Sequence, residues 1–330
     1  MTDDLATPTP AGAVPEPLVA DGLLERIRAG CAGVASRARH VTIDPVALGR
    51  LAGELRPDPP PLLPEERPVR DSDYDVAAQV VAWNAVNFGS GWFPVLHKRP
   101  GLSGARTLAA ALADNVAALG SPTAEWLSDA DTGTCARIFG QPHPGPADEL
   151  MGLFARAWRD LAELLFDFDG SAATLVRSAG GSAERLTATL ATMPLAQDVA
   201  VHDGEPVPLL KRAQITASHL AQATGGSGIG HFDDLHRLTA FADNLVPHTL
   251  RVAGVLGYGD ELADRIAAGE LLTPGEPAEV EVRACAVHAV ELLAARTGLT
   301  PAVIDHQLWQ RGQSPAVKAT PRHRCRTTFY

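Results

Sequence analysis

The sequence predicts a mainly α-helical protein that forms one globular body with a small β excursion, and three observations support this fold class. Alanine and leucine recur at helical spacing along most of the 330 residues. Stretches in which β-branched or aromatic residues alternate with period two, the pattern of a half-buried strand, are few. The chain also has no internal repeat and no heptad run, so neither a solenoid nor a coiled coil is expected.

Apolar residues at helical spacing mark the expected helices. In 149–167, Leu150, Phe154 and Leu161 fall on one face and Glu163 lies off it, which predicts an amphipathic helix that buries that face. The expected helices, in chain order, are 21–37, 45–55, 105–119, 149–167, 181–192, 210–223, 241–256, 259–269, 278–296 and 300–311.

Turn-forming residues mark the ends of some elements. The last expected helix opens with Thr300 and Pro301, an N-cap residue followed by proline at the first helical position. Residues 56–70 (RPDPPPLLPEERPVR) hold six prolines, which excludes a helix or a central strand there and predicts a connector. Residues 224–230 (TGGSGIG) are expected to form a glycine-rich loop between helices.

Two segments are candidates for strands. Residues 199–208 (VAVHDGEPVP) are typical of a hairpin that turns at Asp203 and Gly204, because this dipeptide favours the tight turn between two paired strands. A short strand is expected around 93–97.

The composition predicts a soluble protein. Hydrophobic residues make up 45% of the chain, enough for a sizeable core, yet no apolar run approaches the ~20 residues that a membrane span needs. The first residues (MTDDLATPTPAGAVPEP) are acidic and proline-rich and lack the basic and apolar regions of a secretory signal. We therefore expect a disordered leader over 1–20 and one domain over 21–330.

The cysteines indicate a reducing compartment, so we expect the protein in the cytoplasm. Cys31, Cys135, Cys285 and Cys325 are isolated from one another, and the chain has no C-x-x-C pair. Scattered thiols of this kind predict neither a disulfide framework nor a zinc site.

The formal net charge of −11 argues against a nucleic-acid duplex as the ligand. Affinity for nucleic acid comes mostly from Lys and Arg side chains that neutralise phosphates. We therefore expect a small-molecule ligand and a monomer that has neither a duplex nor a membrane as its partner.

The sequence lacks the motifs of a dinucleotide site, a histidine metal site and a serine-hydrolase site. The G-x-G within 225–230 follows no strand and lacks the remaining glycine of a dinucleotide site. His231 and His236 are five residues apart, off the spacing that places metal ligands on one helix face. Ser218 and His219 are adjacent but lack the G-x-S-x-G of a hydrolase elbow. Neither a metal nor another cofactor is therefore expected.

From Leu209 onward, polar residues stand where a helical pattern calls for apolar ones. Lys211 and Arg212 open an apolar helix, and a solvated cationic pair is the simpler interpretation of them. Asp243 lies between apolar neighbours in FADNLVP (241–247), where it is either a functional carboxylate or the N-cap of a helix.

Together with later segments, these motifs resemble the queuosine salvage family, the queuosine 5′-phosphate N-glycosidases. Order and spacing fit across roughly 205–330, and a weaker match covers 80–110, at Asn87-Phe88 and Ser103-Gly104. The motifs that carry the resemblance are K-R-A-Q-I (211–215), F-A-D with Pro247 (241–247), G-E-L-L (269–272), E-V-E-x-R-x-C (279–285), D-x-x-L-W (305–309) and P-x-H-R-x-R with Tyr330 (321–330).

The chain departs from the family pattern near the expected base pocket. The family reads N-F-S-F-W, whereas this chain reads N-F-G-S-G-W-F-P at 87–94, so Trp92 or Phe93 replaces a nearer ring. His306 and Gln307 follow Asp305, where relatives have aromatic residues, and Gln310 stands where they often have an acid. A related 7-deazapurine nucleotide therefore stays open as the preferred substrate.

The resemblance implies an all-α fold akin to the helix-hairpin-helix DNA glycosylases, and hydrolysis of queuosine 5′-phosphate to queuine and ribose 5-phosphate. Breaking an N-glycosidic bond builds positive charge on the ribose, and a fixed carboxylate near C1′ stabilises that charge. Asp243 is the candidate. Lys211 is the candidate to converge on the same site and bind the 5′-phosphate.

The base and the phosphate need further contacts. A 7-deazapurine has carbon in place of N7, so help for the leaving base must come from hydrogen bonds to its other polar atoms, and Asp305 is expected at its guanine-like edge. Arg324 and Arg326 are further phosphate candidates that could instead pin the C-terminal segment. The remaining expected substrate-binding residues are Phe88, Trp92, Arg212, Phe241, Asn244, His306 and Trp309, the four aromatic ones as stacking partners or core.

Three other functions are weighed against this one. A helix-hairpin-helix DNA repair glycosylase would share the fold and a Lys/Asp pair, but the acidic charge disfavours it. A non-catalytic carrier of queuine or a deazapurine nucleotide would bind without releasing sugar phosphate. A structural protein without a ligand is disfavoured by the charged residues gathered in 205–330.

Overall fold

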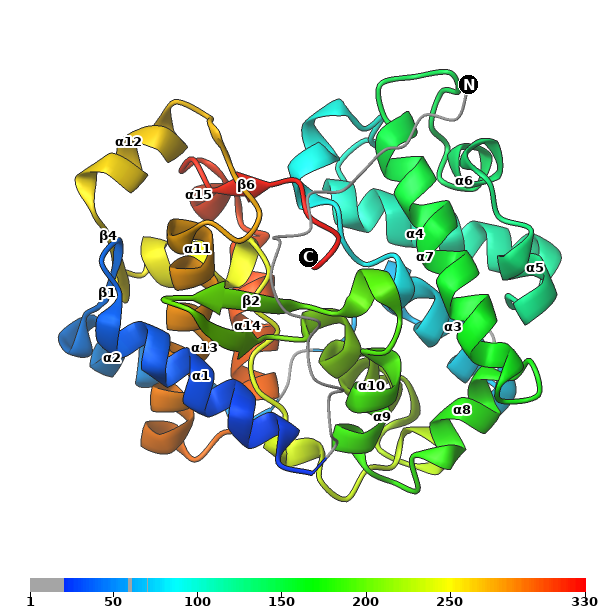
Figure 1. The fold of residues 1–330 in the computed structure, drawn as a ribbon, viewed down its shortest axis with the longest axis horizontal. Coiled ribbons are helices and arrows are strands. Elements are labelled where there is room, and N and C mark those ends of the chain that lie inside the picture. The colour runs from blue at the N-terminus through cyan, green and yellow to red at the C-terminus, as the bar shows by residue number, and fades with distance from the viewer. Residues whose placement is uncertain (1–20, 59–60, 70) are drawn as a thin grey trace.

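The computed structural model describes residues 21–58, 61–69 and 71–330. The expected leader, 1–20, lies outside the described residues. Helices make up most of the described structure, and its strands form small two-stranded sheets (Figure 1). The prediction of a mainly α-helical fold is therefore confirmed.

The elements follow one another along the chain as an almost unbroken series of helices. The α-helices are α1 (Leu23–Arg37), α2 (Pro45–Ala52), α3 (Asp73–Ala85), α4 (Gly104–Leu119), α5 (Ala124–Ser128), α6 (Thr132–Ile138), α7 (Asp148–Phe166), α8 (Ala172–Ser178), α9 (Ala183–Leu190), α10 (Lys211–Thr224), α11 (Leu245–Val252), α12 (Asp260–Ala267), α13 (Pro277–Thr297), α14 (Pro301–Gly312) and α15 (Pro315–Lys318). The strands are β1 (Val41–Ile43), β2 (Val199–His202), β3 (Glu205–Pro208), β4 (Leu256–Tyr258), β5 (Leu271–Leu272) and β6 (Arg324–Cys325).

Every helix expected from the sequence overlaps one of these α-helices, and one boundary is wrong in a way that matters. The expected helix 241–256 is shorter in the structure, because α11 begins only at Leu245 and the chain becomes strand β4 at Leu256. Pro247 lacks an N–H and so fits only the first turn, where a helix leaves its N–H groups unpaired. The residues before Leu245, including Asp243, are thus free to form a loop.

The strand expected around 93–97 is also wrong. Residues 90–95 form a 3₁₀ helix, η2 (Ser90–Val95), that follows Gly89 with φ of 99°. Only glycine adopts this backbone conformation readily, and it turns the chain sharply. Pro94 has no N–H to give to a neighbouring strand, so a compact turn replaces the expected extended segment.

The expected hairpin is present. β2 and β3 pair antiparallel with His202 opposite Glu205, and the turn residues Asp203 and Gly204 have φ of 50° and 84°. Two successive positive φ values are the signature of the tight turn that fits the twist of paired strands. The hairpin leads directly into the first turn of α10.

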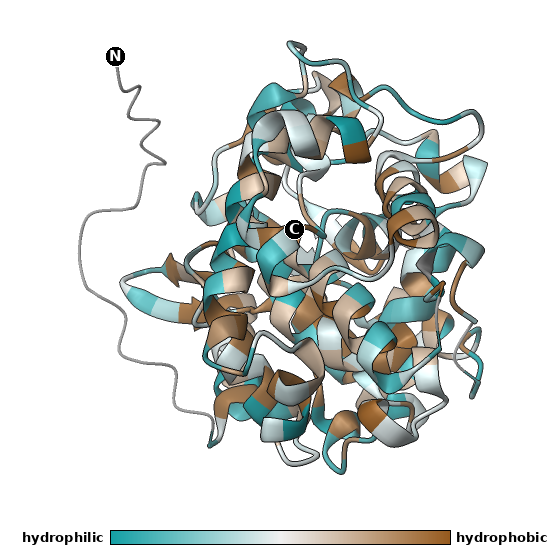
Figure 2. Ribbon diagram, turned by 90° about the vertical axis from the view of Figure 1, so that its right-hand side faces the viewer, coloured by the Kyte–Doolittle hydropathy of each residue, from teal (hydrophilic) through white to brown (hydrophobic). Residues whose placement is uncertain are grey.

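Helix α13 forms the centre of one group of helices. It packs against α1, α14, α11 and α2, and Figure 1 shows it running behind α1 through that group. Its charged residues Glu281 and Arg283 are buried along with its apolar ones. In Figure 2, hydrophobic and hydrophilic residues alternate along many of the other helices, as expected for helices that bury one face.

The C-terminal segment, 321–330, lies between two groups of helices. Figure 1 places its end between the group that contains α1, α11, α13 and α14 and the group that contains α3 to α8. β6 pairs in parallel with β5, and Gly89 N donates a hydrogen bond to Tyr330 O at 2.9 Å. These contacts tie the segment to both groups and close one side of the site described below.

The structure also describes the helices with respect to a membrane and the state of the cysteines. Across the described ranges, no helix combines the length and the apolar character that a membrane crossing requires. Each of the four cysteines is buried and carries a free thiol.

Candidate active site

A pocket opens where α10, α14, the loop before α11 and the C-terminal segment meet. The empty space in it, counted together with its open mouth, is about 930 Å³. The residues that line it are Trp83, Asn87, Phe88, Ser90, Phe93, Ser103, Ala105, Arg106, Ala109, Lys211, Ile215, His219, Phe241, Asp243, Asn244, Leu245, Asp305, His306, Trp309, Gln313, Arg322 and Tyr330.

Asp243 uses one carboxylate oxygen to cap α11. Its Oδ1 accepts hydrogen bonds from Leu245 N at 2.7 Å and Val246 N at 2.9 Å. Its Oδ2 has no hydrogen bond within the described part of the chain, and the side chain lines the pocket. The capping interpretation of Asp243 is therefore confirmed, and its functional role stays a prediction that the second carboxylate oxygen leaves open.

Lys211 is buried beside this carboxylate. It is 4% exposed, so the interpretation as a solvated cation is wrong, and its Nζ donates a hydrogen bond to Asn87 O at 3.0 Å. Burial lowers the pKa of Lys211 to about 8, and the nearby negative charge of Asp243 limits that fall. The ammonium therefore keeps its proton at neutral pH.

A buried ion pair between Asp198 and Arg283 fixes the position of Lys211 relative to Asp243. Asp198 Oδ2 accepts a hydrogen bond from Lys211 N at 3.1 Å. The Nη1 and Nη2 atoms of Arg283 bind both oxygens of Asp198 at 2.8 and 2.7 Å, and its Nε donates to Ala242 O at 3.0 Å. One arginine thus connects the first turn of α10 to the residue before Asp243.

The chain is strained where it enters α10. Leu210 has φ of 52° and ψ of 40°, a left-handed conformation that costs energy for a residue other than glycine. Such strain persists only where the surrounding structure imposes it, and it clusters at functional sites. Here the carbonyl of Asp198 accepts hydrogen bonds from Leu209 N and Leu210 N, which hold the turn and aim Lys211 into the pocket.

Asp305 lies on α14 and closes the deep side of the site. It is 3% exposed, and its Oδ1 accepts a hydrogen bond from Phe241 N at 2.8 Å. Burial and the negative charge of Asp243 raise the pKa of Asp305 to about 8. Asp305 therefore carries a proton at neutral pH, as the acid of many enzyme sites does.

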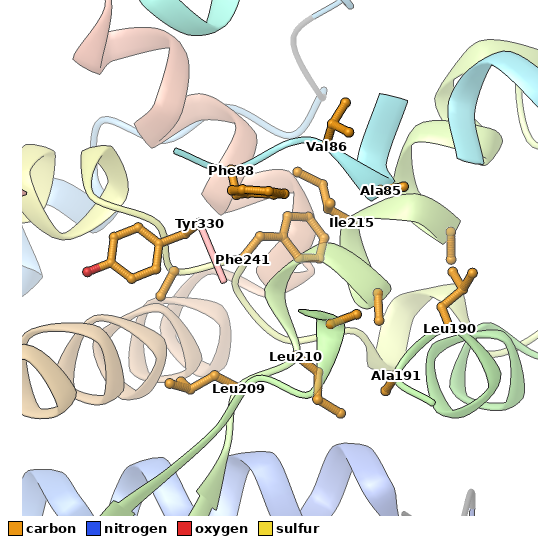
Figure 3. Close-up of a cluster of buried hydrophobic side chains, with 14 of the residues drawn as sticks. Ala85, Val86, Phe88, Leu190, Ala191, Leu209, Leu210, Ile215, Phe241 and Tyr330 are labelled. Atoms are coloured by element: carbon orange, nitrogen blue, oxygen red, sulfur yellow. The ribbon is translucent and has the colours of Figure 1, made fainter. Parts of the chain in front are cut away.

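Aromatic rings form the walls of the pocket. Phe88, Phe241 and Trp309 line it, as expected, and Phe93 joins them from η2. Figure 3 shows the rings of Phe88 and Phe241 close to Ile215 of α10. Trp92 lies elsewhere, because its Nε1 donates to Glu149 at 2.7 Å.

Three expected cationic ligands do not reach the pocket. Arg212 is buried, donates hydrogen bonds to two main-chain carbonyls, and lies 4.8 Å over the ring of Phe88. Arg324 donates to Gly269 O at 3.0 Å, and Arg326 pairs with Glu149 at 2.9 Å. These contacts occupy all three guanidinium groups in holding the fold together.

Arg322 lines the pocket instead, although no motif in the sequence singles it out. It stands at the open position of the family pattern P-x-H-R-x-R. Within the described residues it forms no ion pair, and the charge of Asp243 acts on it. Of the other expected ligands, Asn244 and His306 do line the pocket, and Asn244 Nδ2 is buried without a hydrogen-bond partner in the described ranges.

Comparison with known proteins places the pocket within one family. Residues 71–330 match the family described as queuosine salvage protein. Queuosine 5′-phosphate N-glycosylase/hydrolase of Sphaerobacter thermophilus is 34% identical over 90% of this chain and 95% of its own length. Proteins of the same name from Mus musculus and Dictyostelium discoideum are each 32% identical, over 51% and 63% of this chain and 54% and 65% of their own lengths.

Proposed function

The chain belongs to the queuosine salvage protein family, and we propose on that basis that it hydrolyses the N-glycosidic bond of queuosine 5′-phosphate to release queuine and ribose 5-phosphate. The observation that carries the proposal is the buried ammonium of Lys211 near the capped carboxylate of Asp243, with both side chains lining one pocket. Among the relatives compared, the one aligned over nearly its whole length bears this activity in its name.

Asp243 is the group that meets the ribose. As the bond between C1′ and the base breaks, positive charge grows on C1′ and the ring oxygen. A carboxylate held in place by two backbone N–H groups stabilises that charge without first having to reorganise. Its free Oδ2 is also placed to orient the water that replaces the base.

Asp305 assists the departure of the base. A 7-deazapurine has no N7 to protonate, so the negative charge that develops on the leaving base must be met at another acceptor atom. With its raised pKa, Asp305 carries a proton at neutral pH and can donate it in a hydrogen bond to that atom. Asp305 accepts a hydrogen bond from Phe241 N, and this position beside an aromatic wall of the pocket supports its assignment to the base.

Arg322 and Lys211 supply positive charge for the 5′-phosphate. Arg322 lines the pocket without a carboxylate partner among the described residues, and a guanidinium group suits a phosphate because it donates two parallel hydrogen bonds. Lys211 adds a second cation next to Asp243. The phosphate assignment thus moves from Arg324 and Arg326 to Arg322.

We also infer that the protein acts in the cytoplasm, as a monomer, on the free nucleotide and not on a duplex. The net charge of −11 and the four buried free thiols support the substrate size and the compartment. Sedimentation of a species near 34.7 kDa is the expected result for a monomer.

The test is direct. Pure protein is incubated with queuosine 5′-phosphate, and mass spectrometry follows free queuine and ribose 5-phosphate. We expect both products in equal amounts. Nucleotide that binds but stays intact would identify a carrier, and absence of both binding and products would refute the proposal.

A further inference from the structure

Two histidines that line the pocket have no part in the chemistry proposed above. His219 of α10 is 8% exposed and His306 of α14 is 7% exposed. Their rings meet edge to face with centroids 5.9 Å apart. Buried polar rings of this kind need partners, and the protein provides only some of them.

The hydrogen bonds of the two rings leave one nitrogen of each without a partner. Asn84 Nδ2 donates to Val80 O at 3.0 Å and lies 3.2 Å from His219 Nδ1, so Nδ1 is an acceptor. Gln222 Nε2 lies 3.1 Å from His306 Nδ1 in the same manner. An acceptor at Nδ1 places the ring proton on Nε2. No hydrogen bond to either Nε2 is present in the part of the chain that the structure describes.

Both rings are neutral at physiological pH. Burial lowers the pKa of His306 to about 4, and burial together with the nearby His306 and Lys211 lowers the pKa of His219 well below its ordinary value. Each ring therefore presents a single uncharged N–H donor. A neutral donor binds a hydroxyl or carbonyl oxygen without repelling a cationic group on the same ligand.

His219 lies farther along α10 than Lys211. Lys211, Ile215 and His219 line the pocket from one face of α10 at intervals of four residues, so His219 lies about 12 Å along the helix from Lys211. Arg322 interacts electrostatically with Asp243, whereas His219 interacts with Lys211 and His306. His219 is therefore separated from Lys211, a candidate phosphate ligand, by about two turns of α10.

The proposed substrate is elongated. Its phosphate is followed by C1′ of the ribose, then the 7-deazaguanine base, and last a cyclopentenediol joined to C7 through an aminomethyl link. With the phosphate at Arg322 and Lys211 and C1′ at Asp243, the diol is the end of the substrate farthest from those cations, and we assign it to the histidines. Its hydroxyl oxygens accept hydrogen bonds, and its secondary amine is cationic at neutral pH, which suits uncharged rings.

We propose that His219 and His306 form a subsite in which their Nε2–H groups donate hydrogen bonds to the hydroxyls of the base substituent. The subsite makes the protein select nucleotides whose 7-deazaguanine carries a hydroxylated arm over those with a bare aminomethyl group. This inference rests on the proposed function.

The experiment compares two substrates in matched variants. Queuosine 5′-phosphate carries the diol, and 7-aminomethyl-7-deazaguanosine 5′-phosphate lacks it. In His219→Asn and His306→Asn the new amide reaches only the position of Nδ1, so the distal donor is lost. In His219→Gln and His306→Gln the longer amide restores a donor near the position of Nε2. The quantity measured is the ratio of kcat/KM for the two substrates.

We expect each Asn variant to lower this ratio about tenfold, the effect of one lost hydrogen bond, and each Gln variant to recover much of it. An unchanged ratio, or equal losses on both substrates, would overturn the subsite while leaving the proposed hydrolysis intact. Wild-type protein that released base from neither nucleotide would overturn the proposed function, and the subsite with it.

A second measurement avoids substitution altogether. Queuine and 7-aminomethyl-7-deazaguanine are compared as ligands of the wild-type protein by calorimetry. We expect queuine to bind about tenfold more tightly. Equal affinities would overturn the proposal even if the variants failed to fold.

Discussion

At the scale of single residues, the site depends on side chains that are held by the fold and still offer one free group. Asp243 keeps Oδ2 free because its Oδ1 is bound by the first turn of α11. Lys211 is held through Asn87 O and remains a cation at neutral pH because the carboxylate of Asp243 lies nearby. In both cases a main-chain atom holds the side chain by a hydrogen bond. Because main-chain atoms are already ordered by the fold, this orients the side chain at little further cost in side-chain entropy.

Arg322 gives a prediction that separates phosphate binding from folding. Arg322→Ala should raise the KM for queuosine 5′-phosphate about 10- to 100-fold, the loss expected for charge-assisted hydrogen bonds, and should affect the nucleoside queuosine much less. Steady-state kinetics on both substrates measures this difference.

The matched control for that variant is Arg324→Ala, two residues away and outside the pocket lining. It should leave the KM of the nucleotide near the wild-type value. If Arg322→Ala weakened nucleotide and nucleoside equally, Arg322 would have a structural role.

The pH dependence follows from the two shifted groups. Lys211 and Asp305 both have a pKa of about 8, and both act in their protonated forms. Each loses its proton as the pH rises through that value, so kcat should be level near pH 7 and fall above about pH 8. A pH–rate profile from 6 to 10 measures this limb.

The variant Asp305→Asn shows which of the two groups causes the fall in kcat above about pH 8. Asparagine remains a hydrogen-bond donor at all these pH values, so the limb disappears if Asp305 causes it and persists if Lys211 does. A wild-type rate that stayed level up to pH 10 would contradict both assignments.

At the scale of elements, α10 and the loop before α11 must keep a fixed separation. Asp198 and Arg283 provide it, because Asp198 holds the first turn of α10 while Arg283 holds Ala242 O. The pair is buried, so its desolvation offsets much of its attraction, and its contribution to net stability is small compared with the loss on breaking it. We assign both residues a positioning role.

Arg283→Lys tests that role. Lysine keeps the charge but cannot bind both oxygens of Asp198 and Ala242 O together. We expect kcat to fall about tenfold or more with a smaller change in KM, because the misplaced groups act mainly in the transition state.

A core variant remote from the pocket controls for stability. Leu161→Ala in α7 removes a fully buried side chain and should destabilise the protein by about 2–5 kcal/mol. Measured well below its melting temperature, it should retain a kcat near that of wild type. Equal loss of kcat in both variants would show that Arg283 acts only through stability.

The elements also show what the sequence can predict. Helices with one apolar face, such as α7, were expected, because burial on one side leaves a period in the sequence. Helix α3 was missed, since nearly all of its residues from Val76 to Ala85 are buried and no polar face marks it. The short helices α5, α6 and α8 were missed because 5 to 7 residues carry little periodicity.

The sequence predicts a pocket residue only where that residue belongs to a recognisable short motif. Asp243 and Asp305 stand in such motifs, and both line the pocket. Arg322 and His219 join them through tertiary contacts that no local pattern encodes. Of the two rings offered for the pocket, Phe93 lines it and Trp92 does not, and both lie on a 3₁₀ turn that takes the place of the expected strand.

At the scale of the whole molecule, the site lies where distant parts of the chain converge. The segment 321–330 reaches between the two groups of helices and brings Arg322 and Tyr330 to the pocket (Figure 1). The likeness to helix-hairpin-helix DNA glycosylases stays a prediction. The acidic charge of the molecule supports a nucleotide substrate over a duplex.

That charge makes a prediction about competitors. An excess of duplex DNA at low salt should leave the rate of queuine release unchanged, because a chain with a net charge of −11 attracts few phosphates. The rate is measured with and without DNA at two salt concentrations. Inhibition that weakens as salt rises would indicate duplex binding and favour a DNA-directed activity.

The most direct test of the account concerns the carboxylate of Asp243. Asp243→Asn keeps an oxygen that can cap α11 but removes the negative charge that faces the ribose. In a single-turnover experiment with queuosine 5′-phosphate, we predict that release of queuine slows by about 10³-fold or more while nucleotide affinity changes only a few-fold. Release at the wild-type rate by the folded variant would contradict the account.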